Sequence, residues 1–114
     1  MDDLISDEVV NFILSGKKLH QDVKTRALEH IVDGVAVMLA GSRTECARKV
    51  AGFVKGKSGP PQSTAIGLGF KAYITDAAMI NGTSGHADDY DDSQLSTAPD
   101  RLYGLMTHPT VPVL

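Results

Sequence analysis

The strongest helical pattern of the chain lies in residues 23–41, which read VKTRALEHIVDGVAVMLAG. Its apolar side chains recur at intervals of three and four residues, which is the period of one face of an α-helix. Gly41 stands where the C-terminal cap of a helix belongs. From Val35 to Ala40 the segment is apolar all round, which predicts burial on most sides. The periodic positions are Val23, Ala27, Leu28, Ile31, Val32, Val35, Met38 and Leu39.

Shorter helices are predicted on both sides of this segment, and capping residues mark where they begin. Ser6 is placed to cap the first of them. Ser42 and Glu45 have the spacing of a capping box at the start of the second. Cys46, in the first turn of that helix, is predicted to be a small buried hydrophobe. The predicted helices cover residues 6–15, 42–56 and about 75–86.

Few residues are predicted to be extended. Ser63–Ile66 is a short extended candidate, and Gly67-Leu68-Gly69 after it has the composition of a turn. The glycine- and proline-rich residues 56–61 and the polar residues 93–107 are predicted to be loops. The economical interpretation is an all-α fold with at most short extended segments.

The composition limits the class of protein. A chain of 114 residues suffices for one small domain and is too short for a two-domain enzyme. A net charge of -3 predicts no general attraction to nucleic acid or to an anionic membrane. No apolar run is long enough to cross a bilayer. The single cysteine excludes an internal disulfide and fits a reducing compartment, so a cytoplasmic protein is expected.

The chemistry of the chain is concentrated in residues 86–93, HADDYDDS. Four carboxylates fall within five residues, and such close charges repel one another unless a cation or bulk water relieves them. A solvated turn, a metal site and an acid–base site all remain open. If the preceding helix continues, His86 and Asp89 share one face. The spacing of Asp88 to Asp92 also satisfies the DDxxD pattern that binds Mg²⁺ in isoprenoid enzymes.

Two segments together resemble the MmgE/PrpD family, which includes 2-methylcitrate dehydratase, cis-aconitate decarboxylase and iminodisuccinate epimerase. They are residues 77–93, AAMINGTSGHADDYDDS, and residues 107–114, THPTVPVL. The resemblance implies a large all-α domain with a smaller α/β lid domain, a homodimer, and neither a metal nor another cofactor. It implies chemistry on a small polycarboxylate by proton transfer α to a carboxylate.

The resemblance also assigns roles to particular residues. Asp89 matches the active-site aspartate of the family, and His108 matches its His-Pro histidine. Ser93 stands where the family usually has threonine, and these three residues are the catalytic candidates. His86 and Thr107 are the candidates for substrate binding. The segment between Ser93 and His108 is longer than in the methylcitrate and aconitate enzymes, which leaves the substrate open.

The resemblance therefore predicts that residues 1–114 are the N-terminal part of a single helical domain, truncated after Leu114. A polycarboxylate needs compensating cations, which the acidic segment lacks, so later residues are expected to supply them. The chain by itself is then expected to be inactive. The alternatives are a non-catalytic helical fragment or interaction module, and the Mg²⁺ site described above.

Overall fold

The computed structural model describes residues 4–57, 59–90 and 111, and the backbone of residues 93–95 and 104–106. Within these residues the fold is mainly α-helical, with only three-residue strands. This confirms the predicted all-α fold with at most short extended segments. The helices are α1 (Ile5–Leu14), α2 (Gln21–Gly41), α3 (Glu45–Lys55) and α4 (Ile74–His86), and the strands are β1 (Ser63–Ala65), β2 (Phe70–Ala72), β3 (Ser93–Leu95) and β4 (Gly104–Met106).

The strands form two antiparallel pairs. β1 pairs with β2, with Thr64 opposite Lys71, and β3 pairs with β4, with Gln94 opposite Leu105. The predicted extended segment at Ser63 is confirmed. The prediction of a loop throughout residues 93–107 is wrong, because β3 and β4 lie within it. The two strands are joined by hydrogen bonds between backbone groups, and three residues are too few to show the alternation of apolar and polar side chains that predicts a strand.

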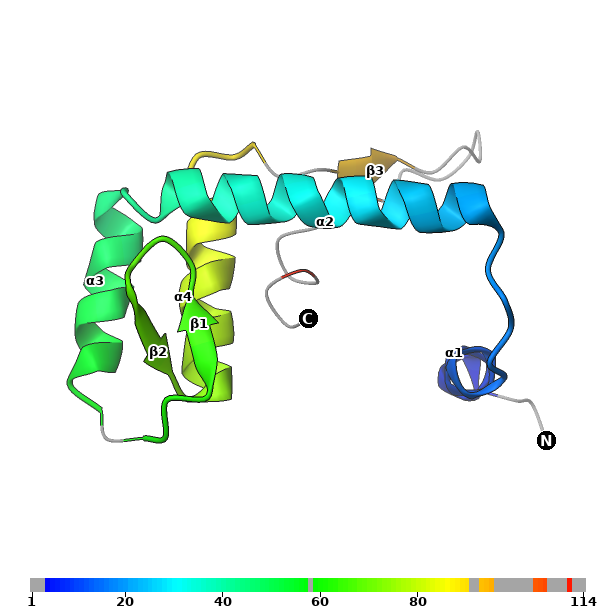
Figure 1. The fold of residues 1–114 in the computed structure, drawn as a ribbon, viewed down its shortest axis with the longest axis horizontal. Coiled ribbons are helices and arrows are strands. Elements are labelled where there is room, and N and C mark those ends of the chain that lie inside the picture. The colour runs from blue at the N-terminus through cyan, green and yellow to red at the C-terminus, as the bar shows by residue number, and fades with distance from the viewer. Residues whose placement is uncertain (1–3, 58, 91–92, 96–103, 107–110, 112–114) are drawn as a thin grey trace.

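Helix α3, helix α4 and the β1–β2 hairpin gather at one end of α2. In Figure 1, α3 and α4 lie side by side beneath the C-terminal end of α2, and the β1–β2 hairpin packs against them. α1 lies at the other end of α2, away from this cluster. The radius of gyration is 16.7 Å, compared with about 13 Å for a compact domain of this length. The shape is therefore extended, and one end of the molecule holds its core.

The core is small and rich in alanine. Residues from α3, the hairpin and α4 form it, and Ile80 of α4 is its largest fully buried member. The turn of the hairpin contains Gly67 and Gly69 with φ of 76° and 73°, which confirms the predicted turn. Such values favour glycine because a Cβ would be strained there. The core residues are Val54, Ala65, Ala72, Ala77 and Ile80, with Val50, Leu68 and Phe70 packed against them.

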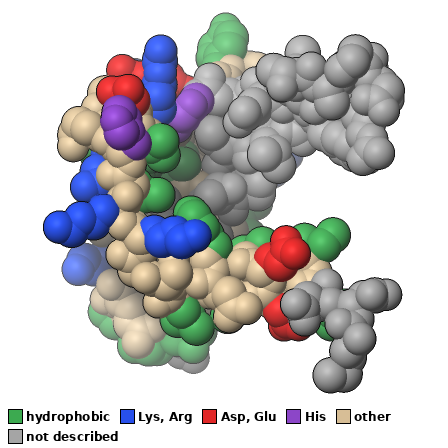
Figure 2. All heavy atoms as spheres, turned by 90° about the vertical axis from the view of Figure 1, so that its right-hand side faces the viewer, with side chains coloured by type: hydrophobic (Ala, Val, Ile, Leu, Met, Phe, Trp, Pro, Cys, Tyr) green, Lys and Arg blue, Asp and Glu red, His purple; other side chains and the backbone are tan. Residues whose placement is uncertain are grey.

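Much apolar surface of α1 and α2 remains exposed. No residue of α1 is buried, and Figure 2 shows apolar side chains along this helix in the lower half of the view. The predicted burial of Val35 to Ala40 on most sides is wrong: Met38 is 1% exposed, whereas Leu39 is 52% exposed. Among the helices of the described residues, α4 is the one with which α2 shares most of its contacts. No helix within the described residues is long and apolar enough to cross a membrane.

Both predicted N-terminal helix caps are wrong. α1 begins at Ile5 after Leu4, so Ser6 already lies in its first turn. α3 begins after Thr44, whose Oγ1 accepts a hydrogen bond from the Ala47 N–H, while Ser42 donates to the Leu39 carbonyl. Within α3 the side chain of Ala47 is buried, whereas that of Cys46 is exposed. The prediction that Cys46 is buried is therefore also wrong.

Replacing Thr44 tests which residue caps α3. Thr44→Ala is expected to lower the free energy of unfolding by about 1 kcal/mol, because one N–H of the first turn loses its acceptor. Ser6→Ala is the control and is expected to change it by less than about 0.5 kcal/mol, because Ser6 caps no helix. Urea unfolding monitored by circular dichroism measures both values. An equal loss in the two variants would contradict the assignment.

Candidate functional site

Helix α4 is fixed to the β1–β2 hairpin by one buried side chain. Asn81 is 5% exposed, and its Oδ1 accepts a hydrogen bond from the Ile66 N–H at 2.9 Å. Its Nδ2 donates to the Thr64 carbonyl oxygen at 3.0 Å. One amide side chain thus bonds the backbone of the hairpin as a further strand would. This pair of bonds fixes the position of α4 relative to the hairpin.

Helix α4 also approaches α2 very closely. A Cβ added at Gly41 would lie 2.9 Å from the Ser84 carbonyl carbon and 3.3 Å from the Ala87 Cβ. Gly41 is the last residue of α2, and Ser42 follows it with φ of -58°. The predicted role of Gly41 as a C-terminal cap is therefore wrong. Its missing side chain instead lets the two helices meet beside the end of α4.

The end of α4 places a histidine and an aspartate side by side. The helix stops at His86, with Ala87 as its C-cap. Asp89 follows with φ of 56°, a left-handed conformation that aspartate tolerates better than most residues. Its N–H donates to the His86 carbonyl oxygen at 3.1 Å. His86 Nδ1 lies 3.9 Å from Asp89 Oδ1, so the two groups are neighbours although the helix has ended.

This pair lies on the surface. The side chains of His86 and Asp89 are 50% and 90% exposed. The distance of 3.9 Å is too long for a hydrogen bond but close enough for attraction when the imidazole is protonated. A carboxylate serves as an acid or base near neutral pH when desolvation or crowding by like charges raises its pKa, and an exposed position lacks the desolvation. The pair therefore forms one wall of a candidate site and needs a covering element to become an enclosed pocket.

A family model for the MmgE/PrpD N-terminal domain matches residues 10–100. The chain belongs to the MmgE/PrpD N-terminal domain family. No curated protein and no solved structure matches it. The match to the MmgE/PrpD model includes α2, α3, the β1–β2 hairpin, α4 and the turn that holds Asp89.

The structure brings together only some of the residues predicted from the MmgE/PrpD resemblance. His86 and Asp89 meet at the end of α4. Ser93 begins β3 and pairs with Met106 through the backbone. His108 and Thr107 lie outside the described residues. Their position relative to Asp89 therefore stays a prediction.

The helical premise of the Mg²⁺ hypothesis does not hold. A DDxxD motif presents its carboxylates on one face only if the run is helical, whereas α4 ends at His86 and Asp89 has a left-handed backbone. Among the residues that the structure describes, no group of three or more His, Cys, Asp or Glu side chains is arranged to hold a metal ion. Asp91 and Asp92 lie outside those residues, so the addition of EDTA and Mg²⁺ in the exchange experiment below tests for magnesium directly.

The role of Asn81 in holding the hairpin is not predicted from the sequence. A polar residue within the apolar residues of α4 was the available signal, because a buried amide needs partners. Its partners are 15 and 17 residues earlier in the chain, and nothing in the local sequence identifies them.

Proposed function

We propose that this chain is the N-terminal part of a lyase domain that acts on a small polycarboxylate. In the proposed reaction a proton moves at the carbon α to a carboxylate, with loss of water or CO₂ or with inversion. The observation that carries the proposal is the His86–Asp89 pair, held at 3.9 Å at the end of α4 within the range matched by the family model. Asp89 is one of the three catalytic candidates, and His86 is one of the two candidates for substrate binding.

The proposed division of labour follows from charge. Asp89 acts as an acid–base group, with His108 and Ser93 beside it, and His86 and Thr107 bind the substrate. Residues 86–93 contain no Lys or Arg, so the cations that neutralise a polycarboxylate come from other parts of the protein. Residues 1–114 alone are then inactive, because a site without those groups and without a cover is not preorganised. The reaction requires no metal or other cofactor, as the resemblance implies.

The proposed setting is a cytoplasmic homodimer. A single cysteine suits a reducing compartment. The apolar side chains of α1 are 50–81% exposed, and a ten-residue helix is only marginally stable in water on its own. A surface of this kind is covered in a larger assembly. The same observation favours the second candidate function, a non-catalytic helical interaction module.

The experiment that separates these candidates is deuterium incorporation into a substrate. The full-length polypeptide is incubated in D₂O with citrate-like di- and tricarboxylates, and exchange at the carbon α to a carboxylate is followed by NMR. Dehydration, decarboxylation and epimerisation of the proposed kind all involve this proton. Asp89→Asn is expected to lower the exchange rate by about 100-fold, the lower end of the effect of a general acid or base.

Asp88→Asn is the matched control. Asp88 is exposed, and its substitution removes the same charge one residue away from Asp89. The exchange rate of Asp88→Asn is therefore expected to stay within about twofold of the rate of the unaltered protein. Addition of EDTA is expected to leave the rate unchanged. Absence of exchange with every acid would favour the interaction module. A rate that EDTA abolishes and Mg²⁺ restores would contradict the cofactor-free reaction.

A further inference from the structure

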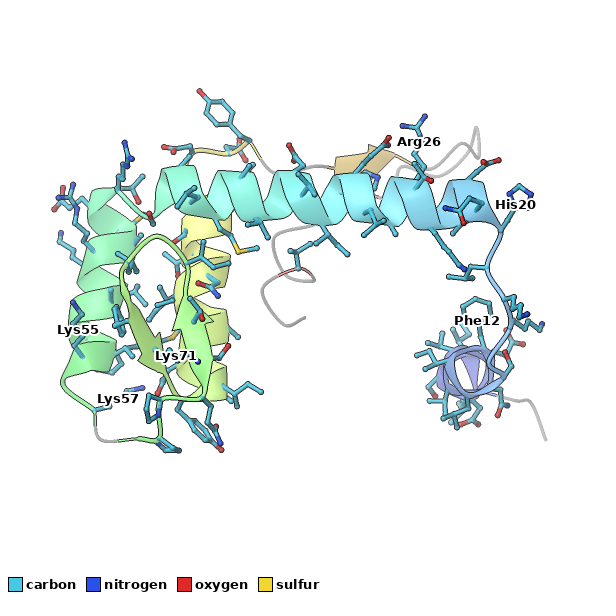
Figure 3. The ribbon with its side chains drawn as sticks, viewed as in Figure 1. Phe12, His20, Arg26, Lys55, Lys57 and Lys71 are labelled. Carbon is cyan, nitrogen blue, oxygen red and sulfur yellow. The ribbon has the colours of Figure 1, made fainter. Side chains whose placement is uncertain are left out.

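A small cavity lies near the beginning of α4, away from the His86–Asp89 pair. It is bordered by the C-terminal end of α3, the loop after α3, β2 and the start of α4, and its volume is about 190 Å³. Figure 3 shows Lys55, Lys57 and Lys71 at this end of the molecule, opposite to Phe12 of α1. These three lysines come from three different elements. The cavity is lined by Val54, Lys55, Lys57, Gly59, Phe70, Lys71, Ala72, Tyr73 and Asp76.

Two of the lysine ammonium groups are held in place. Lys55 Nζ lies 4.6 Å from the centroid of the Phe70 ring, and Phe70 is part of the β1–β2 hairpin. Lys57 Nζ lies 4.6 Å from the centroid of the Phe53 ring and 2.9 Å from Asp76 Oδ1. Aromatic faces and a carboxylate attract ammonium groups and reduce the number of positions that they sample. A ligand that binds these groups therefore loses less entropy than one that binds free surface lysines.

The charge around the cavity is unbalanced. Asp76 is the single acidic group among the described lining residues, and it offsets one of the three lysines. Two positive charges remain without a compensating group in the lining. Like charges around one small cavity repel one another, and a bound dianion relieves this repulsion.

The kind of cation favours phosphate over carboxylate. Arginine presents a planar fork that matches a carboxylate, whereas lysine acts as a point charge, which suits the distributed charge of a phosphate group. No arginine is among the described residues that line the cavity. A phosphate monoester carries about -1.5 to -2 charges at pH 7, which matches the excess of two. The volume is also below the roughly 300 Å³ at which pockets for drug-sized ligands begin.

We propose that this cavity binds the phosphate group of a small phosphorylated molecule through Lys55, Lys57 and Lys71. The site is separate from the proposed active site: Asp76 and His86 are ten residues apart on α4, or about 15 Å along the helix. The proposal therefore goes beyond the proposed lyase function and does not depend on it. One helix connects the two sites.

The test is calorimetric titration of the full-length protein with inorganic phosphate at constant ionic strength set by chloride. Saturable binding of one phosphate per chain is expected. Lys55→Gln and Lys71→Gln are each expected to weaken it by about tenfold or more, the effect of losing one hydrogen bond to a charged group. Lys55→Arg retains the charge, and its phosphate affinity is expected to stay within a few-fold of that of the unaltered protein. Circular dichroism confirms that each variant is folded.

Lys49→Gln is the matched control. Lys49 lies on α3 outside the cavity, is 75% exposed and pairs with Glu45 at 2.7 Å, and its removal changes the net charge by the same amount. Phosphate affinity is expected to stay within twofold. An equal loss in Lys49→Gln and Lys55→Gln would show general surface attraction and overturn the site. Absence of saturable binding would overturn it as well.

Two further measurements define the ligand, and a third separates this site from the lyase function. The first is competition with citrate. If citrate displaced phosphate, bound more tightly than phosphate and lost affinity in Lys55→Gln, the choice of phosphate as the ligand would be overturned. The second is cosedimentation of the protein with vesicles of phosphatidic acid. If the protein cosedimented with them and Lys55→Gln did not, the ligand would be a lipid headgroup and not a soluble molecule. Asp89→Asn is expected to leave phosphate affinity within twofold. The phosphate site and the lyase function can therefore fail independently of each other.

Discussion

Gly41→Ala is expected to lower the free energy of unfolding by about 3 kcal/mol or more. The added Cβ would meet the Ser84 backbone, at 2.9 Å from the carbonyl carbon and closer still to its oxygen. Backbone in a helix cannot rotate away as a side chain does, so α2 and α4 must separate. Forced expansion of a packed contact costs about 1–3 kcal/mol, and more where backbone must move. Urea unfolding measures the loss, a large share of the stability of a small domain.

Gly52→Ala is the matched control for this prediction. Gly52 also lies in a helix, α3, but a Cβ there would meet no described atom within 4 Å other than the backbone of its own helix. Alanine favours a helix interior over glycine by about 0.5–1 kcal/mol, so Gly52→Ala is expected to stabilise the protein by that amount. The same substitution is therefore expected to change the free energy of unfolding in opposite directions at the two positions. If both substitutions stabilised the protein, the close approach of α2 and α4 at Gly41 would be wrong.

Asn81→Ala is expected to lower the free energy of unfolding by about 2–4 kcal/mol. The substitution removes both hydrogen bonds between α4 and the hairpin, and it leaves the Ile66 N–H and the Thr64 carbonyl without this partner. Both hydrogen bonds are partly buried, and a polar group left without its partner away from water costs about 1–3 kcal/mol. Hydrogen exchange of the Ile66 amide gives a local measurement, and its protection is expected to fall together with the global stability.

Thr83→Ala is the control for the loss of Asn81. Thr83 lies on the same helix, and its Oγ1 donates only to the Met79 carbonyl, which already belongs to α4. Its removal is expected to cost less than about 1 kcal/mol, because no contact between elements is lost. Asn81→Asp keeps the acceptor for the Ile66 N–H and loses the donor to Thr64. If Asn81→Ala and Thr83→Ala had equal effects, the attachment of α4 to the hairpin would not depend on Asn81.

The helices could be predicted because their signals are local. In α2 the apolar residues recur at the helical period, and α4 was predicted within one residue of its observed ends. The strand β2 was not predicted, because Phe70-Lys71-Ala72 is too short for an alternating pattern. The cap of α3 is predicted two residues early because Ser42 and Thr44 are both good caps. In the structure Ser42 is buried beside Gly67 of the hairpin turn, and its hydroxyl donates to the Leu39 carbonyl instead.

The candidate site was predicted in part for the same reason. His86 and Asp89 are three residues apart, so a turn at the end of a helix suffices to bring them together. That turn formed although the helix did not continue, because the left-handed backbone of Asp89 returns its N–H to the His86 carbonyl. The expected burial of Val35 to Ala40 failed because burial depends on what covers a helix, and α2 contacts α4 on only part of its surface.

The sequence by itself determined the helices, the hairpin turn with its two glycines, and the chemical groups at the end of α4. Each of these depends on residues within a few positions of one another. Only the tertiary structure decided that Gly41 is a contact with α4 and that Asn81 holds the hairpin. Both roles require a partner distant in the chain: Ser84 lies 43 residues after Gly41, and Thr64 lies 17 residues before Asn81. A local pattern shows that a residue is small or polar, but the packing of the elements determines what that residue contacts.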